Sequence, residues 1–447
     1  MTTELSKAWE LFESGDPQGS MRALLPAAEG LTSAEIAPLV ARLAEGAGFT
    51  DLAEASAELA ARPAEAERLY GFGYACVERG LPDLAVPALR AALGLALEPA
   101  PAPAPGRTGL FRRRPKAPAG TGLGPRRVLL ELVTALERVE RHTDALALLQ
   151  EHDSLLADWP DRYLAVYNAL MAGRTDTARE VFGGLSAPEG VWAGPGRRVG
   201  RMLDRAAALP PTGLQDLRGW HYVLTGGLLL TLSPHGFDQG MTGRWAYLQE
   251  DFGSCLHGLH RLRTVLEATG RTPASVGLLP DRGSRALGLA AARLLGVPAS
   301  PYRPGTPDAL VVAYDLTTCD PETVAALGER APGELLFEHA TCWTEPPAAT
   351  ADVCTLLVQS VTAPWEPGLR LTEDGRAERG EPDGRSAEEL AEAILAADPA
   401  PAEGDGRTPD DPDAALAAFA ARAAGLWADG PRDAVRSSGP VRSGRFA

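Results

Sequence analysis

One stretch constrains the fold more than any other: residues 275–295, which read SVGLLPDRGSRALGLAAARLL. A short apolar run, a polar elbow and an apolar pattern with i, i+3, i+4 spacing predict a strand, a turn and a helix, with Ser284 as the N-cap. Such a unit belongs in a parallel α/β sheet, where ligands bind outside the carboxyl ends of the strands and helix N-termini attract anions. Arg282 and Arg285 stand at that end, so they are either anion ligands or solvated turn residues.

Strands and helices continue to alternate on both sides of this unit. The predicted strands are Val276–Leu279, Ser300–Tyr302, Ala309–Tyr314, Glu334–Phe337 and Val353–Ser360. The predicted helices between them are residues 254–269, 286–295 and 321–330. This order predicts a mostly parallel α/β sandwich over residues 211–366. Upstream, Trp220–Leu224 and Leu228–Leu232 are expected to form a hairpin or two linked strands.

The amino-terminal part of the chain carries an internal repeat. A turn residue is followed five positions later by a small residue and nine positions later by an apolar one. The five copies begin at Gly15, Gly48, Gly80, Glu140 and Gly173. Most of the spacings are close to 33 residues, which is typical of a helix-turn-helix repeat.

The best copy, Leu69–Leu97, resembles the tetratricopeptide (TPR) family, with Phe72, Gly73, Ala85 and Leu89 at that family's large and small positions. The resemblance implies a helical solenoid over residues 1–97 and 128–210 whose concave groove binds another protein or a peptide. The alternative is a helical packing module that only stabilises the second domain.

The one long spacing in the repeat is explained by residues 98–127, which are rich in Pro, Ala and Arg. We expect this segment to be a disordered insertion, because it has too little apolar surface to bury. Its Phe111–Arg114 run is either a docking motif for an acidic partner or part of a basic tether.

The strand at 309–314 runs into Asp315, Thr317 and Thr318, and this stretch resembles the diphosphate-ribose motif of type I phosphoribosyltransferases. The resemblance implies that Asp315 holds ribose hydroxyls and that the threonine loop cradles a 5′-phosphate, with Mg²⁺ required only if this phosphosugar site is real. The preceding elbow then corresponds to the family's pyrophosphate loop. Its candidate ligands are Asp281, Arg282, Ser284 and Arg285.

The motif departs from that family at three positions. Tyr314 replaces the first acid, and Cys319 and Asp320 replace the Thr and Gly of the loop. A carboxylate at position 320 repels a phosphate. A binding module without catalysis is therefore favoured over a transferase.

Other candidate residues lie on either side of that motif. A glycine-rich loop over residues 233–245 offers His235 and Arg244, either as ligand contacts or as parts of a covering loop. The pair His257 and His260 lacks a third metal ligand nearby in sequence. The pair His339 and Cys342 is too close in sequence to indicate a catalytic dyad.

Composition limits the classes of partner. A formal net charge of −16 argues against a nucleic-acid surface, which needs clustered cations. The apolar runs are too short to span a bilayer, and the first residues are charged, unlike a secretory signal. Five cysteines without paired metal spacing predict neither a disulfide frame nor a structural zinc site. We therefore expect a cytoplasmic protein.

The carboxyl-terminal residues 367–430 are expected to be acidic linkers with two helices, and residues 431–447 a disordered basic tail. The complete expectation is a multidomain α + α/β protein. Its predicted function is interaction or regulation through the helical repeat, with an α/β domain that binds a small anionic ligand, for example a phosphorylated one, or is purely structural. The alternative is an enzyme that acts on a phosphorylated sugar or nucleotide.

Overall fold

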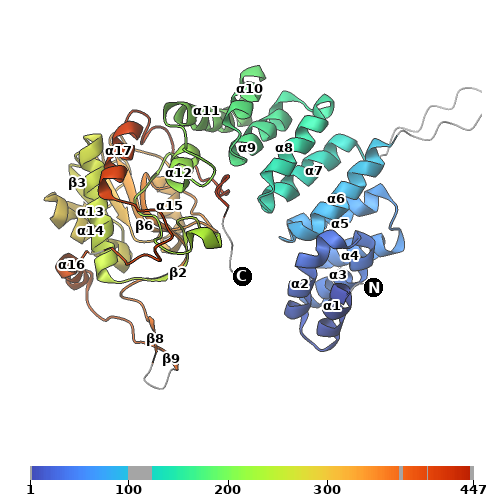
Figure 1. The fold of residues 1–447 in the computed structure, drawn as a ribbon, viewed down its shortest axis with the longest axis horizontal. Helices are drawn as coiled ribbons and strands as arrows, with labels where there is room; N and C mark the ends of the chain where they lie inside the picture. The colour runs from blue at the N-terminus through green and yellow to red at the C-terminus, as the bar shows by residue number, and fades with distance from the viewer. Residues whose placement is uncertain (1–2, 99–122, 372–375, 400, 443–447) are drawn as a thin grey trace, which may run out of the picture. The chain divides into compact units, whose positions relative to one another are not determined.

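The computed structural model describes residues 3–98, 123–371, 376–399 and 401–442 (Figure 1). These residues form two compact units. The helical unit comprises Met1–Ala172 and Asp176–Pro188, and the α/β unit comprises Gly173–Thr175 and Glu189–Ala447. Most of the predicted insertion, residues 99–122, lies outside the described residues, and its last residues begin a helix at Pro125.

The helical unit is built from successive antiparallel helices. They are α1 (Thr3–Glu13), α2 (Pro17–Leu24), α3 (Ser33–Ala47), α4 (Thr50–Ala61), α5 (Ala66–Glu78), α6 (Pro82–Leu97), α7 (Pro125–Arg138), α8 (His142–Glu151), α9 (Tyr163–Met171) and α10 (Thr175–Gly184). Three short helical turns, η1 (Leu25–Gly30), η2 (Asp153–Leu155) and η3 (Asp158–Arg162), join some of them.

All five predicted turn residues have left-handed backbone, with φ between 56° at Glu140 and 84° at Gly15. The small residue five positions after each turn is buried. A different small position, Gly73 of α5, also brings two helices close, because a Cβ on Gly73 would lie 2.6 Å from Leu89 Cγ of α6. The helix-turn-helix spacing is therefore present in the structure.

The sheet of the α/β unit is parallel throughout its described pairings. Its strands are β1 (Leu228–Leu229), β2 (Trp245–Gln249), β3 (Ser275–Leu278), β4 (Ala299–Pro301), β5 (Ala309–Ala313), β6 (Leu335–Cys342) and β7 (Val353–Thr362). The spatial order is β1-β7-β6-β5-β3-β4, and β2 pairs with the carboxyl half of β7. Strands β3 to β7 thus have the 2-1-3-4-5 order of doubly wound sheets, with the topological switch between β3 and β5.

The described part of the α/β unit also contains seven α-helices. They are α11 (Ala193–Ala208), α12 (Leu217–Thr225), α13 (Phe252–Thr269), α14 (Arg282–Leu295), α15 (Pro321–Leu327), α16 (Ala387–Ala396) and α17 (Asp413–Ala423). The short turns are η4 (Gly190–Trp192), η5 (Phe237–Gln239) and η6 (Leu316–Thr318), and β8 (Leu369–Leu371) pairs with β9 (Ala377–Arg379).

The larger core of the unit lies beneath α13 and α14, which are side by side in Figure 1. α16 packs against α14, and α17 packs against α13. A smaller core on the other face of the sheet contains residues of α15. The predicted mixed α/β class is confirmed, and so is the parallel sheet.

Three local predictions were wrong. Trp220–Leu224 lies in helix α12, because Asp216 Oδ1 accepts from Gly219 N and caps a helix start that the aromatic run concealed. The N-cap of α14 is Asp281, one turn before Ser284. The predicted loop up to Trp245 ends in a strand, β2.

The predicted disordered tail is also wrong for its described part, residues 431–442. Arg432 is 3% exposed and Val441 is 1% exposed. Asp433 forms a β-bridge with Ala349. The segment is ordered because Arg432 pairs with buried carboxylates, a contact across about 80–100 residues of sequence that local composition cannot reveal.

None of the helices in the described ranges combines the length and the apolar composition required to cross a membrane.

Candidate functional site

The topological switch between β3 and β5 brings together the two predicted motifs. Asp281 caps α14 through Ser284 N at 2.8 Å, and Ser284 Oγ accepts from Tyr314 N at 2.9 Å. Cys319 Sγ lies 3.6 Å from Asp281 Oδ2. Burial, with Asp281 nearby, raises the pKa of the Cys319 thiol to about 12. This thiol is therefore protonated at neutral pH and is not an activated nucleophile.

The two arginines of the elbow do not point at this switch. Arg282 donates to the backbone carbonyls of Asp383 and Arg385, and Arg285 pairs with Glu388 of α16 at 2.9 Å. Both guanidinium groups thus hold the carboxyl-terminal segment that leads into α16.

The amino end of α14 is covered by an aromatic side chain. A Cβ on Gly283 would lie 2.8 Å from Trp365 Cζ2, and Trp365 itself is buried. An indole therefore packs against the first turn of α14, beside the helix N-terminus where the phosphate was predicted.

The predicted ribose loop is a closed turn. Asp315 Oδ1 accepts from Thr317 N at 2.8 Å and from Thr317 Oγ1 at 2.6 Å. Thr318 Oγ1 donates to Asp315 O at 2.8 Å. The polar groups that the resemblance assigns to a sugar phosphate therefore bond to one another in η6.

A buried polar network that the sequence analysis missed lies at the carboxyl half of the sheet. Glu250, directly after β2, accepts from Tyr314 Oη at 2.6 Å and from Ser254 Oγ at 2.6 Å. Its Oε1 lies 2.9 Å from His339 Nε2, and His339 Nδ1 lies 3.2 Å from Thr355 Oγ1. The signal that could have revealed it is a Glu-His pair, residues 338 and 339, inside an otherwise apolar strand.

The network has a defined charge and a defined packing. Burial raises the pKa of Glu250, but the attraction of His339 and the hydrogen bonds of His339, Ser254 and Tyr314 lower it overall. The Tyr314 ring stacks on the His339 ring at 5.5 Å and meets Trp365 edge-on at 4.8 Å. Burial, with Glu250 nearby, raises the pKa of Tyr314, so the phenol stays protonated and donates.

Cys255 completes a group with this network in which three potential metal-ligand atoms lie within 4.8 Å of one another. Within the described ranges, Glu250, Cys255 and His339 form the one such group of three or more residues, and it includes neither His257 nor His260. Both carboxylate oxygens of Glu250 and both ring nitrogens of His339 already take part in hydrogen bonds. The donor set therefore fits a structural hydrogen-bond network better than an open ligand site.

Glu338 points to the other face of the sheet, because adjacent strand residues alternate. It accepts from Leu316 N at 2.8 Å and contacts Thr341 Oγ1 at 2.6 Å. Burial raises its pKa to about 8, so this carboxyl is mostly protonated at neutral pH. The same edge of the sheet thus holds one ionised and one neutral acid on opposite faces.

The two residues of the glycine-rich loop have different environments. His235 is exposed, and its backbone pairs with Ser233 Oγ. Arg244 is 2% exposed and lies over the Trp343 ring, 5.4 Å from its centroid. Among the described candidate ligand residues, Arg244 and Ser284 are therefore the two that the structure buries.

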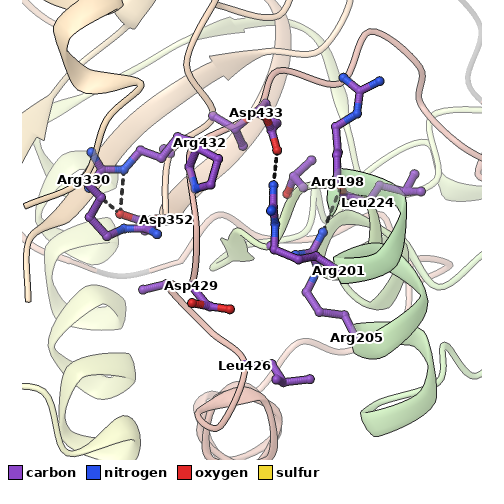
Figure 2. Close-up of a pocket in the computed structure, with 16 residues that line it drawn as sticks. Arg198, Arg201, Arg205, Leu224, Arg330, Asp352, Leu426, Asp429, Arg432 and Asp433 are labelled. Carbon is purple, nitrogen blue, oxygen red and sulfur yellow. Dashed lines mark hydrogen bonds and ion pairs between the residues drawn. The ribbon is translucent and has the colours of Figure 1, made fainter. Parts of the chain in front are cut away.

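Figure 2 shows a pocket at the amino ends of β6 and β7, lined by five arginines and three aspartates. Arg330 and Arg432 pair with Asp352, and Arg201 pairs with Asp433. Its volume is about 20 Å³, room for one or two waters. Ion pairs between these side chains fill the pocket and leave no space for a ligand. The same ion pairs connect segments of the chain.

The remaining deep arginine there, Arg205, donates to the carbonyls of Val223 and Leu224 at 3.0 and 3.2 Å. Burial lowers its pKa to about 10, so it stays charged at neutral pH. It ties α11 to the carboxyl end of α12.

The helical unit contains a much larger opening, a groove of about 480 Å³ between η1, α6 and α8. Its apolar lining is Val86, Pro87, Ala147 and Leu148. Its charged lining is Glu29, Arg90, Arg141, Asp144 and Glu151.

One part of the charged lining is fixed by internal pairing. Arg141 binds both Glu29 and Asp144, with Arg141 Nε 2.7 Å from Asp144 Oδ2. Arg90 on α6 and Glu151 on α8 form no ion pair with any residue in the described part of the chain. The groove therefore presents an apolar floor and one available charge of each sign.

No protein-family model, curated protein sequence or solved structure matches this chain.

Proposed function

We propose that the protein is an interaction scaffold whose helical unit binds a peptide segment of a partner protein in the groove between η1, α6 and α8. The groove itself carries this proposal, because its volume of about 480 Å³ falls in the range of ligand-binding clefts. The resemblance of the repeat to the tetratricopeptide family supports the same role. We further propose that the protein is located in the cytoplasm.

The lining defines the chemistry of the segment. Val86, Pro87 and Leu148 offer an apolar floor, which suits one or two aliphatic side chains of a bound peptide. Arg90 and Glu151 each accept an opposite charge on the peptide. A segment with alternating charge around an aliphatic anchor is therefore the expected partner.

In this proposal the α/β unit is not catalytic. Arg282 and Arg285 hold the segment that leads into α16, and Trp365 covers the helix N-terminus beside them. The alternative of a phosphosugar enzyme requires these groups to be available to a substrate, so it has less support.

The test is selection of peptides from a random display library on the full chain. Ala147 and Ala57 are both exposed helix residues, but only Ala147 lines the groove. We expect selected peptides to bind Ala147→Arg at least about 10-fold more weakly and Ala57→Arg with unchanged affinity, because a long cation blocks the floor. Equal binding to both variants, or no enrichment of any peptide, would refute the groove as the binding site.

A charge variant sharpens the test. Arg90→Glu leaves two acids facing each other across the groove, whereas Arg22→Glu makes the same change on the exposed face of α2. We expect peptides with an essential acidic residue to lose binding to the first variant only.

A further inference from the structure

The helical unit presents an aromatic and acidic surface on α5 and α7 that is separate from the groove. Tyr70, Tyr74 and Glu78 follow one another at intervals of four along α5, so they share one side of that helix. Arg127 and Glu131 have the same spacing on α7, and Arg127 Nε donates to Tyr70 Oη at 2.9 Å. We call these five residues the α5–α7 face.

The two tyrosine rings of the α5–α7 face are stacked but differ in exposure. Their centroids are 6.1 Å apart, and their planes differ by 24°. Tyr70 is 8% exposed, and the Arg127 guanidinium lies over its ring, 5.0 Å from the centroid. Tyr74 is 44% exposed, and no cation within the described ranges lies over its ring. Because the face of an aromatic ring attracts cations, Tyr74 offers a second stacking position.

The two carboxylates of the α5–α7 face favour the arrival of another cation. Glu78 is exposed and Glu131 is half-buried, and neither forms an ion pair in the described part of the chain. Burial, with the charge of Glu78, raises the pKa of Glu131, although Arg138 and Arg127 act in the opposite direction. The two nearby arginines therefore offset the negative charge only in part.

The helical unit already contains an arginine that is held by an aromatic ring and a carboxylate together. Arg79 lies over the Phe49 ring, 4.9 Å from its centroid. It also donates to Asp51 Oδ1 from Nε at 3.0 Å and from Nη2 at 2.6 Å. A guanidinium can make both contacts because it is planar. Tyr74, with Glu78 one helical turn later, provides the same two groups without the arginine.

We propose that the α5–α7 face binds an arginine-containing segment of a partner protein. The guanidinium of the segment stacks on the Tyr74 ring and pairs with Glu78 and Glu131. Charge complementarity favours a cation at this position, and stacking on the ring favours arginine over lysine. The site is distinct from the groove between η1, α6 and α8, so it can stand or fall independently of that groove.

Blocked glycine-serine peptides that carry two arginines test the proposal on the full chain. Matched peptides carry two lysines or two citrullines, and citrulline keeps the planar shape of arginine without its charge. We expect fluorescence anisotropy to show at least about 3-fold tighter binding of the arginine peptide than of the lysine peptide, and no binding of the citrulline peptide. Equal binding of the arginine and citrulline peptides, or no binding of the arginine peptide, would overturn the proposal.

Variants of the exposed ring test the stacking. Tyr74→Ala should weaken binding of the arginine peptide at least about 3-fold and remove its advantage over the lysine peptide, whereas Tyr74→Phe should keep both. Tyr247→Ala, which removes a similarly exposed tyrosine from β2, is the matched control and should change nothing. An affinity in Tyr74→Ala equal to that of its control would refute the stacking and with it the proposal.

A charge variant tests the pairing. Glu131→Gln should weaken binding of the arginine and lysine peptides alike by about 2–5-fold, because both lose a carboxylate partner. Glu54→Gln makes the same change at an exposed position on α4 and should alter neither affinity. The same small effect in both variants would mean that only the net charge of the protein attracts the peptide, and the proposal would fail.

Two further variants test where the peptide binds and what competes with it. Ala147→Arg blocks the groove and should leave the affinity for the arginine peptide unchanged. Loss of binding in this variant would place the peptide in the groove and overturn the proposal. Replacement of Arg112–Arg114 by serines should also leave the affinity unchanged. Markedly tighter binding after that replacement would make the chain's own arginines the occupant, and the proposal of a partner segment would fail.

Discussion

The contacts that hold the helical unit together join residues close in sequence, whereas those that hold the α/β unit together join residues far apart in sequence. In the helical repeat a turn residue and a buried small residue are five positions apart, and the same pair occurs five times, with the turn at Gly173 assigned to the α/β unit. In the α/β unit Arg432 bonds to Asp352 and Glu334, which are 80 and 98 positions away. The helical unit therefore depends on contacts between residues that are close in sequence. The α/β unit is complete only when its carboxyl-terminal segment packs against the rest of the unit.

Other contacts repeat this difference. Asp411 pairs with Arg218 and Arg261, 193 and 150 positions away, and Trp427 Nε1 donates to Asp352 O at 2.9 Å. Residues 405–433 thus close the α/β unit at several points. We infer that loss of one such contact unfolds more structure than loss of one turn in the helical unit, and the following predictions test this difference.

The largest effect is expected at Arg432. Arg432→Ala leaves Asp352 and Glu334 as buried carboxylates with one cation fewer, which costs about 3–5 kcal/mol of unfolding free energy. Hydrogen exchange of peptides from β6 measures the stability of the α/β unit separately from the helical unit. Arg436→Ala, at an exposed position in the same segment, is the matched control and should change stability by less than about 0.5 kcal/mol. A cost for Arg432→Ala as small as that of its control would show that the cluster is dispensable.

A smaller effect, with a characteristic pH dependence, is expected at Glu338. The pKa of Glu338 is about 8 in the folded chain and 4.5 in the unfolded chain. The contribution of the neutral carboxyl to the free energy of unfolding is therefore complete below pH 4.5 and is lost as pH rises through 8. Glu338→Gln keeps an acceptor for Leu316 N and cannot ionise. We expect the variant to exceed the wild type in stability at pH 8 by about 2–4 kcal/mol and to lose this advantage at pH 4.5. An advantage that is the same at both pH values would contradict a neutral Glu338.

The opposite sign is expected for Glu250, which follows β2 and pairs with His339, the neighbour of Glu338 in β6. The folded pKa of Glu250 is lowered, so its contribution is present above the unfolded value of 4.5 and is lost as pH falls through the folded value. Glu250→Gln should therefore cost about 1–3 kcal/mol at pH 7 and much less at strongly acidic pH. Exchange of β6 peptides over a pH series gives both curves. A cost that does not change with pH would show that charge plays no part in the network.

The sequence predicted the features of both units that depend on neighbouring residues and missed the contacts between residues far apart in sequence. The turn spacing and the apolar run of β5 predicted helix pairs and a central strand, because each depends on a few neighbouring residues. The elbow at Asp281–Arg285 was placed correctly at a strand end. Its chemistry was not, because the partners of Arg282 and Arg285 lie about 100 positions later.

The buried network was hidden for a similar reason. Glu250, Tyr314 and His339 lie on three separate segments, and nothing near any one of them indicates the other two. Arg244 and the carbonyl of Ser438 are 194 positions apart. Loop composition could therefore single out Arg244, while its contact with Ser438 in the folded chain could not be predicted.

The smallest effect is expected at the one turn of the repeat that lacks glycine. Glu140 has a φ of 56°, a conformation that costs an L residue roughly 1 kcal/mol relative to glycine. Glu140→Gly should stabilise the helical unit by about 0.5–1 kcal/mol, and Gly80→Ala, the reverse change at the preceding turn, should destabilise it by a similar amount. Exchange of peptides from α7 and α8 measures the first change, and peptides from α5 and α6 measure the second. Because each turn acts on the two helices that it joins, both effects should stay within the helical unit. Hydrogen exchange in β6 should be unchanged. A shift in β6 as large as the shift in the mutated hairpin would show that the two units fold together.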